Sequence, residues 1–405
     1  MDPILDFLTR SVAVRQDGRV GLDGLLLVTY PPLVASAIEM NYPIDYGTKN
    51  DIVSHCIMEL LSKKTLNTRN LLRMTNTLAA KESKKPLNRY VVLSHISVVF
   101  PISVVNIRYD KCHISIRRSF PTGFSRGEIK ETIIGYYGNE ASPCSYSVAK
   151  ITVRALNPYD AATKGLYILN TLRGIWNFTL KYNWAPINQP FVFPLNDIVL
   201  GPVHTVHLAS GALATKDIWY EPNYREHRNA INIGNKYKEL RNSEYKIRNT
   251  LNHMNTNDKN TMKYIFGLYS VALDEWNWDV VYLNLWNMLE NILKKEGERK
   301  INIGRRASFI HKNAMLAEQN INILKCHRNS MLHDINGERA SWAHIYYLKK
   351  YIDSLILFIV NNVRRFKTID NIIELFSLPT DIDKLMNDIK LIKKAYRKRG
   401  GLVKL

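Results

Sequence analysis

Apolar side chains recur every three or four residues through residues 246–405, and this helical periodicity restricts the possible folds more than any other feature of the chain. The longest apolar stripe runs along residues 341–367, and a second runs along residues 277–296. A helix with such a stripe must bury it against other helices. The pattern predicts an all-α bundle whose helices occupy about 246–272, 277–296, 303–318, 341–367 and 380–398, with a further helix starting near 321.

Residues 1–220 follow a different pattern. A helical stretch at about 49–82 precedes three runs that are dense in Val and Ile and typical of strands. Asp110-Lys111 is a plausible hairpin tip between two of these runs, and Asp160 can cap a helix that starts after Pro158. The strand-like runs lie at 89–100, 104–120 and 145–156, with a further strand-like segment at about 185–214.

A polar stretch at about 221–245 separates these two patterns and is nearly free of large aliphatic side chains. We therefore expect an α+β protein with two regions. A mixed α/β region, 1–245, ends in this polar linker, and an all-α bundle, 246–405, follows it.

The charge of the chain points to a polyanionic partner. Its 56 basic and 36 acidic side chains leave a formal net charge of +20. Nucleic acid is the commonest partner for such a surplus, although some basic proteins have no such partner. His204 and His207 lie three residues apart, so on a strand they would point to opposite faces, and no metal or other cofactor is expected.

The compartment is predicted from what the chain lacks. No apolar run is long enough to span a bilayer, and the opening MDPILDFLTR does not resemble a secretory signal. The four cysteines, Cys56, Cys112, Cys144 and Cys326, are scattered without a CxxC pair. These features predict a cytoplasmic protein without a membrane partner.

The segment CHRNSMLHDINGE, residues 326–338, carries the groups with the clearest chemistry. Arg328 offers forked donors to a phosphate, His333 can exchange a proton near neutral pH, and Asn329 can hold a hydroxyl or phosphate oxygen. Such groups suit RNA cleavage without a metal, in which a ribose 2′-OH attacks the adjacent phosphorus. Positions five apart on a helix differ by about 140°. Arg328 and His333 therefore share a cleft only if the helix begins or kinks near Arg328.

Each of these groups also has an ordinary structural interpretation. Arg328 could pair with Asp334 or Glu338, and His333 could be a satisfied core residue. The pattern Arg-Asn-x-x-x-His is short enough to arise by chance. Neither a GxxxxGK phosphate loop nor a GxSxG motif is present, which disfavours NTP hydrolysis and serine-hydrolase chemistry.

Residues 245–370 resemble the HEPN superfamily of helical bundles, and more narrowly the Apea-like HEPN domains of bacterial phage-defence proteins. The resemblance lies in LWNMLENIL with its Leu289-Glu290 pair, then RRASFIHKNAMLAEQNINILK, then CHRNSMLHDI. It implies a metal-independent endoribonuclease that acts as a homodimer, with two Arg-His motifs facing one cleft. Arg328 and His333 would be catalytic, Asn329 would assist them, and Glu290 would orient Arg328.

The resemblance also has departures and consequences for partners. The family often has His-Gly where this chain has His333-Asp334, and an acid there can raise the pKa of the histidine. Ile335 occupies the position at which related toxins carry a tyrosine that is nucleotidylated. The implied role is that of an abortive-infection effector that cleaves RNA, such as tRNA or mRNA. Its N-terminal region would sense an unknown phage or cellular trigger.

Basic side chains near the bundle are candidate RNA contacts, although most such side chains are simply solvated. They are Lys294, Lys295, Arg299, Lys300, Arg305 and Arg306. The alternative function is a catalytically inactive HEPN bundle that binds nucleic acid or a partner protein. A DNA-binding regulator is disfavoured because no helix-turn-helix signature is present.

Overall fold

The computed structural model describes the backbone in several ranges and forms two compact units. These ranges are 1–11, 13–14, 20–21, 24–137, 145–182, 194–222, 224, 229–295, 297–299, 301–333 and 339–399. The first unit comprises Met1–Ile96, Ile102–Tyr167 and Gly201–Pro222, and the second comprises Ser97–Pro101, Ile168–Leu200 and Asn223–Leu405. The expected α+β class is confirmed. The sequence predicted two consecutive regions, 1–245 and 246–405, whereas each of the two units takes several separate segments of the chain.

Four helices at the start of the first unit pack around a core of their own. They are α1 (Asp2–Arg10), α2 (Gly24–Ala37), α3 (Tyr46–Ser62) and α4 (Thr68–Ser83), with the short strands β1 (Ala13–Val14) and β2 (Val20–Gly21) between α1 and α2. Leu8, Val53, Ile57 and Leu71 are fully buried in this core. The helical stretch predicted at 49–82 is confirmed as α3 and α4, and between them the chain turns at Lys64, which has a positive φ of 54°.

A six-stranded sheet forms the rest of the first unit, in the order β5-β6-β7-β3-β8-β9. Its strands are β3 (Asn88–Ile96), β5 (Val104–Tyr109), β6 (Cys112–Arg117), β7 (Ser147–Ala155), β8 (Leu200–Leu208) and β9 (Trp219–Tyr220). The pairs β5–β6, β6–β7 and β3–β7 are antiparallel. The predicted hairpin tip is confirmed: Asp110 and Lys111 have φ of 49° and 65°, which a tight two-residue turn requires.

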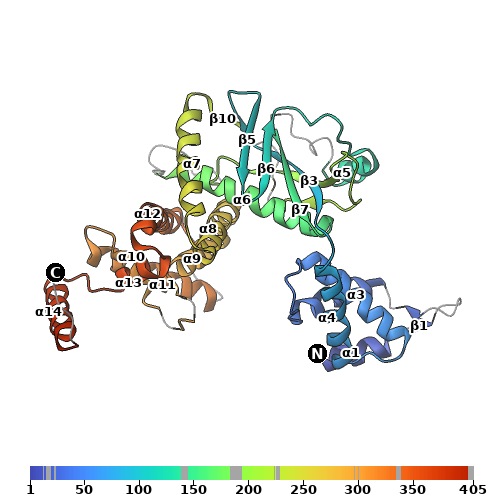
Figure 1. Ribbon diagram of the computed structural model, residues 1–405, viewed down its shortest axis with the longest axis horizontal. Coiled ribbons are helices and arrows are strands. Elements are labelled where there is room, and N and C mark those ends of the chain that lie inside the picture. Colours follow the sequence, from blue (N-terminus) through green and yellow to red (C-terminus); the bar gives the residue numbers. More distant parts are fainter. Residues whose placement is uncertain are drawn as a thin grey trace. The chain divides into compact units, whose positions relative to one another are not determined.

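Helix α6 spans Pro158–Lys181, and its first part, up to Tyr167, packs on one face of this sheet (Figure 1). A Cβ added at Gly165 would lie 2.7 Å from Val92 Cγ2, so the close approach of helix and strand requires glycine. The predicted cap is wrong in detail. Asn157 Oδ1 accepts a hydrogen bond from the Asp160 backbone N–H at 2.9 Å. Asp160 Oδ2 accepts instead from the Leu156 backbone N–H and from Lys164 Nζ.

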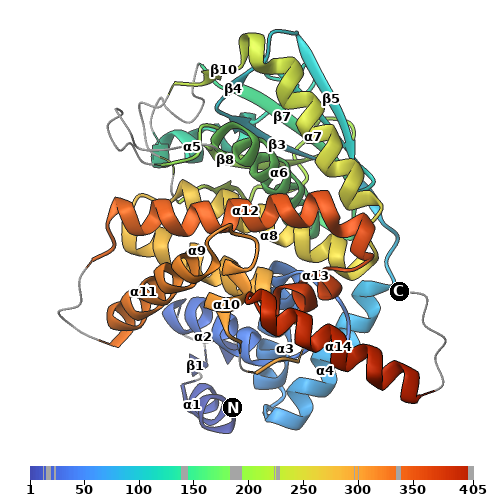
Figure 2. The same ribbon diagram turned by 90° about the vertical axis from the view of Figure 1, so that its left-hand side faces the viewer.

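The second unit is mainly helical, as its apolar stripes predict. Beyond the end of α6 it contains α7 (Tyr237–Asn252), α8 (Thr256–Asp274), α9 (Trp278–Leu293), α10 (Ile303–Ser308), α11 (Ala314–His333), α12 (Trp342–Phe366), α13 (Ile369–Phe376) and α14 (Ile382–Lys398). In Figure 2, α12 runs beside α8 and α9, and α9 packs against both. The stripe through Leu348, Ile352 and Leu355 is fully buried at this packing.

Two boundaries in this unit differ from expectation. The predicted helix at 303–318 is wrong, because α10 ends at Ser308 and α11 begins at Ala314. The polar stretch 221–245 is only partly a connection. It holds β10 (Ile231–Asn232), which pairs in parallel with β4 (Val98–Val99), and the beginning of α7. Of the helices described, none is both long and apolar enough to cross a membrane.

The remaining short elements belong to the connections. A 3-10 turn at Gly127–Ile129 leads into α5 (Lys130–Tyr137) beside the sheet, and another at Gly234–Lys236 leads into α7. Helix α14 has no buried residue, so its apolar side chains, including Ile382 and Ile392, remain exposed.

Candidate active site

Arg328 and Asn329 lie near the C-terminal end of α11, and the helix continues unbroken from Ala314 to His333. The motif therefore ends a helix, and the expectation that a helix begins or kinks near Arg328 is wrong. Arg328 is half-buried and Asn329 is exposed, and Arg328 Nη1 donates to Asn329 Oδ1 at 3.2 Å. The side chain of His333 and all of Asp334 lie outside the described residues.

The Arg328 guanidinium is not held by an acid in the described part of the chain. Its hydrogen bond to Asn329 involves a neutral amide, and no carboxylate within the described ranges forms an ion pair with it. The alternative partners Asp334 and Glu338 lie outside those ranges. A half-buried guanidinium with free donors is suited to bind a phosphate.

Behind Arg328, three rings from three helices pack together. Tyr282 on α9, His327 on α11 and His344 on α12 form this ring cluster. The ring centroids of Tyr282 and His327 are 5.3 Å apart, and those of His327 and His344 are 3.9 Å apart. Tyr282 donates its hydroxyl hydrogen to the Leu324 carbonyl oxygen at 2.5 Å. The ring cluster thus fixes the turn of α11 that carries Arg328.

The electrostatics of the ring cluster agree with this placement. Burial raises the pKa of the Tyr282 hydroxyl, and the charge of nearby Arg328 opposes that rise. His344 Nδ1 accepts a hydrogen bond from the Ser341 backbone N–H at 3.2 Å. His327 Nε2 is buried without a hydrogen-bond partner among the described residues. The sequence does not predict the contact between His327 and His344, because only the fold brings their two helices together.

Glu290 is not brought to Arg328. Its Oε1 accepts a hydrogen bond from Trp286 Nε1 at 2.7 Å, one turn earlier on the same helix. No ion pair between Glu290 and Arg328 exists in the structure as described. In the described contacts, the Glu290 carboxylate therefore binds Trp286 and does not orient Arg328.

The basic candidates for RNA contact fall into different classes. Arg306 is 9% exposed, and its guanidinium donates to both Glu298 oxygens, to Ser377 Oγ and to the Leu293 carbonyl. The prediction that Arg306 contacts an RNA phosphate is therefore wrong, because its guanidinium donates hydrogen bonds to groups inside the protein. Lys295 Nζ binds Glu374 Oε1 at 2.8 Å. Lys294 and Arg299 are exposed, Arg305 is half-buried, and Lys300 lies outside the described residues.

We predict that Arg306→Ala destabilises the protein. Removing the guanidinium leaves Glu298 and the Leu293 carbonyl without their partners, so we expect a loss of about 2–4 kcal/mol in the free energy of unfolding. Urea unfolding measures this loss. Arg299→Ala is the matched control, because Arg299 is exposed, and it should change stability by less than about 0.5 kcal/mol. Equal effects of the two substitutions would contradict the structural role of Arg306.

The histidines considered for a metal have other environments. His207 is buried, with Nε2 at 2.9 Å from Thr205 Oγ1 and Nδ1 at 3.1 Å from the Gly211 carbonyl oxygen. His204 is also buried on β8. In the residues that the structure describes, no three His, Cys, Asp or Glu side chains gather as metal ligands would.

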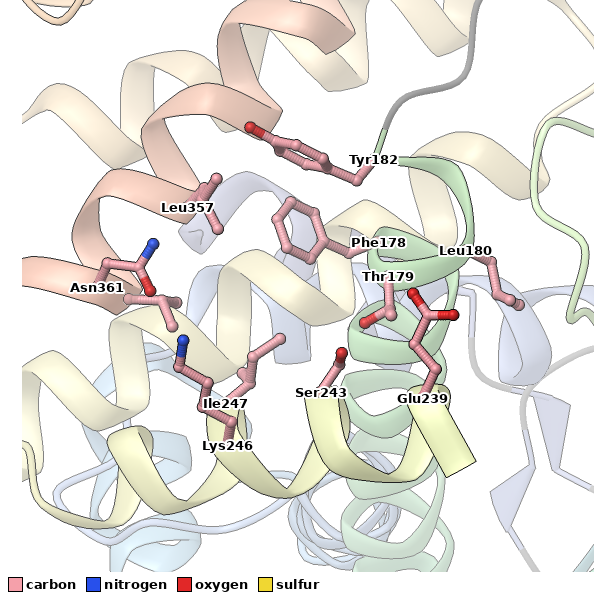
Figure 3. A pocket seen from close by; sticks show the side chains of 11 residues that line it. Phe178, Thr179, Leu180, Tyr182, Glu239, Ser243, Lys246, Ile247, Leu357 and Asn361 are labelled. Atoms are coloured by element: carbon pink, nitrogen blue, oxygen red, sulfur yellow. The ribbon is translucent and has the colours of Figure 1, made fainter. Parts of the chain in front are cut away.

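A separate pocket of about 320 Å³ lies between α6, α7 and α12 (Figure 3). Phe178 from α6 and Tyr182, which directly follows α6, line one side; Lys246 from α7 lines another, and Leu357 comes from α12. Leu357 follows His344 by 13 residues on α12, which is about 20 Å along the helix axis. This pocket is therefore not part of the site around Arg328.

Comparison with known proteins adds no assignment. No family model, no curated protein and no solved structure matches this chain. The chemistry must therefore be argued from the site alone. That site offers the Arg328 guanidinium, the adjacent amide of Asn329, and a histidine five residues further along the chain.

Proposed function

We propose that the protein is a metal-independent endoribonuclease of the HEPN type that works as a homodimer. The observation that carries the proposal is the half-buried Arg328 guanidinium, which has no acidic partner among the described residues and lies beside Asn329. An arginine at the surface loses little free energy when no acid pairs with it, because water solvates its charge. A partly buried arginine without an acid is stabilised when an anion binds to it. The phosphodiester of RNA is an anion of suitable geometry.

In the proposed reaction, His333 takes the proton from a ribose 2′-OH. The 2′-oxygen then forms a bond to the adjacent phosphorus, and the bond from phosphorus to the 5′-oxygen breaks. Arg328 stabilises the negative charge that develops on the phosphate oxygens, and Asn329 positions an oxygen of the same group. A proton returns to the leaving 5′-oxygen. The products carry a 2′,3′-cyclic phosphate and a 5′-hydroxyl.

A second copy of the chain is part of the proposal because one motif supplies only one histidine. The reaction needs both removal and return of a proton, which two motifs facing one cleft can provide. Exposed apolar side chains on α11 support such contact: Ile323 is 63% and Leu332 is 48% exposed close to Arg328. Large apolar side chains at a surface often mark an interface.

The cellular role is proposed from the HEPN resemblance alone. In this proposal the protein acts as an abortive-infection effector in anti-phage defence, and the first unit responds to a phage or cellular trigger. RNA such as tRNA or mRNA would be the substrate. Lys294, Arg299 and Arg305 remain candidates for contact with that RNA.

We expect the purified protein to cleave RNA in EDTA, because no step of the proposed reaction uses a metal. Analysis of the fragments should find 2′,3′-cyclic phosphate and 5′-hydroxyl ends. RNA with 2′-O-methyl riboses should stay intact, since it lacks the attacking hydroxyl. Cleavage that EDTA abolishes, or that yields 5′-phosphate ends, would contradict the proposal.

The second candidate function is a catalytically inactive HEPN bundle that binds nucleic acid or a partner protein. Asp334 favours it, because an acid stands where the family often has glycine. Binding of unmodified RNA without cleavage, with and without phage extract as a source of trigger, would support this candidate against the endoribonuclease.

A further inference from the structure

The sheet of the first unit packs one face on α6, and its opposite face carries basic side chains beside a buried apolar patch of Val91, Leu93 and Val148. Val92 on β3 points toward α6, where it meets Gly165. Side chains along a strand alternate between the two faces of the sheet, so His95, three residues further on, lies on the face away from α6. The strands β3, β5, β6 and β7 contain no Asp or Glu at all. Registers from strand to strand place six basic side chains on the face away from α6: Arg89, Arg108, His113, Arg117, Lys150 and Arg154.

The basic face is exposed toward one end, and its strands contain no acidic side chain. Arg89, Arg108, His113 and Arg154 are exposed. Arg89 stands directly opposite Arg154 in the β3–β7 register. Like charges at directly opposed positions destabilise a sheet. Burial, followed by the charges of Arg117 and Arg89, lowers the pKa of the Lys150 amine. An anion bound beside Arg89 and Arg154 would relieve the repulsion between them.

At one end of the basic face lies a cavity of about 540 Å³, within the range of small-ligand sites. Arg117, Val148 and His95 are directly opposed on neighbouring strands, and His95 and Val148 line this cavity. Phe120 and Phe124, from the loop after β6, line it as well. Among the described residues, the lining includes the cations Arg118, Arg126 and Lys130 and no carboxylate.

Among the described residues, the buried atoms His95 Nδ1 and Arg117 Nε at this end lack a hydrogen-bond partner. His95 is 5% exposed and lines the cavity, and its Nδ1 has no hydrogen-bond partner among the described residues. Arg117 Nε is likewise buried and unpartnered within the described ranges. Unsatisfied buried polar atoms are costly, so they mark a place where a ligand can supply the missing bonds. Aromatic rings nearby are already in contact with cations: Arg126 Cζ lies 5.0 Å from the Phe120 centroid and Lys150 Nζ lies 4.5 Å from that of Phe124.

We propose that the basic face and its cavity bind a single-stranded nucleic acid. Phosphates along the strand contact the cations of β3, β5, β6 and β7, and one nucleotide enters the cavity, where Phe120 and Phe124 offer ring faces and edges to its base. Open sheets with basic and aromatic side chains are a common solution for unpaired strands, since stacking and phosphate contacts tolerate many sequences. This inference concerns binding by the first unit and does not depend on cleavage by Arg328 and His333.

The test measures fluorescence anisotropy of a labelled oligonucleotide of about 12 nucleotides, within the usual site size for such surfaces. The strand carries 2′-O-methyl riboses, so cleavage cannot affect the result. The full chain should bind it, with an affinity that falls as salt rises. The pair Arg89→Gln and Arg154→Gln should weaken binding at least about tenfold and reduce the steepness of the salt dependence by about 1.4, for two lost phosphate contacts.

A matched control separates this surface from general positive charge. Arg69→Gln with Arg73→Gln removes the same charge from exposed positions on α4 and should change affinity less than twofold. The pair Arg118→Gln and Lys130→Gln should also weaken binding, because it alters the cavity. Removing the opposed arginines Arg89 and Arg154 should leave the melting temperature equal or higher, which shows that lost binding is not lost folding.

Three results would overturn the inference. One is no binding by the full chain at 50 mM salt, a concentration at which phosphate contacts are strong. Another is equal weakening by the α4 control pair. The third is displacement of the strand by a mononucleotide as effectively as by an unlabelled strand, which would reduce the site to a small-ligand cavity.

Discussion

Replacing His333 by alanine should reduce RNA cleavage at least about 100-fold, because general acid–base catalysis by a positioned side chain contributes about 10² to 10⁴. Arg328→Ala should cost about 10² to 10³, since it removes the charge that stabilises the developing phosphate anion. Both substitutions lie at the end of α11, on which Arg328 is half-buried and makes no ion pair among described residues. Cleavage of a fluorescent RNA under single-turnover conditions measures each loss.

Controls can be drawn from similar positions. Lys325→Ala removes an exposed cation from the same helix, and His55→Ala removes an exposed histidine from α3. Each should leave cleavage within about twofold of the wild type, and all four variants should keep the wild-type circular dichroism spectrum. If the His333 and Arg328 variants cleaved as well as these controls, the assignment of the site would be wrong.

The dimer can be tested with the same assay. If two copies build the site, the activity per chain should fall when the protein is diluted below its dimer dissociation constant, as measured by sedimentation. Activity per chain that stays constant while the dimer dissociates would show that one copy is sufficient.

Arg173→Ala should destabilise the second unit by about 3–5 kcal/mol, because it leaves a buried carboxylate without its cation. Arg173 Nη2 lies 2.8 Å from Asp274 Oδ2, and the two side chains are 1% and 7% exposed. Arg173 also donates to the Ile198 carbonyl, and Asn196 Nδ2 donates to Asp274 Oδ1 at 2.6 Å. These contacts join α6 to α8 and to the segment before β8. Urea unfolding followed by circular dichroism measures the loss.

A double substitution separates the effect of the unpaired charge from the effect of the lost side-chain volume. Arg173→Met combined with Asp274→Leu removes both charges and keeps the space filled, so it should recover much of the stability lost in Arg173→Ala. Lys63→Ala, which breaks the exposed pair with Glu59, should cost less than about 1 kcal/mol. A cost for Arg173→Ala no greater than that of Lys63→Ala would contradict a stabilising buried pair.

Local patterns predicted the elements that depend on neighbouring residues. The hairpin at Asp110-Lys111 was predictable because the alternating runs and the turn lie within one short segment. The helix at 341–367 was predictable because its apolar stripe repeats over many turns and matches α12. The division at Ser308 was not, because both α10 and α11 have helical composition and only their packing shows where one ends.

In the candidate site, likewise, the sequence predicts some residues, whereas their neighbours depend on contacts between distant parts of the chain. Arg328 and Asn329 could be selected from their chemistry and spacing. Their surroundings could not, because His344 reaches His327 from another helix. Glu290 is on the expected helix, but its carboxylate meets Trp286. The basic face of the sheet was also missed, since its cations come from four strands and become neighbours only through register.

By itself, the sequence determined most of the helices and strands, though not every boundary between them, because periodicity acts within a few residues. Only the tertiary structure decided what each charge does. Arg306 and Arg328 are the same residue on helices of the same unit, yet Arg306 is enclosed by Glu298 and by Ser377, 71 residues away, whereas Arg328 meets only a neighbouring amide in the described chain. The reason is physical: an arginine becomes structural or available for an anion according to which groups the fold places within hydrogen-bonding distance of it.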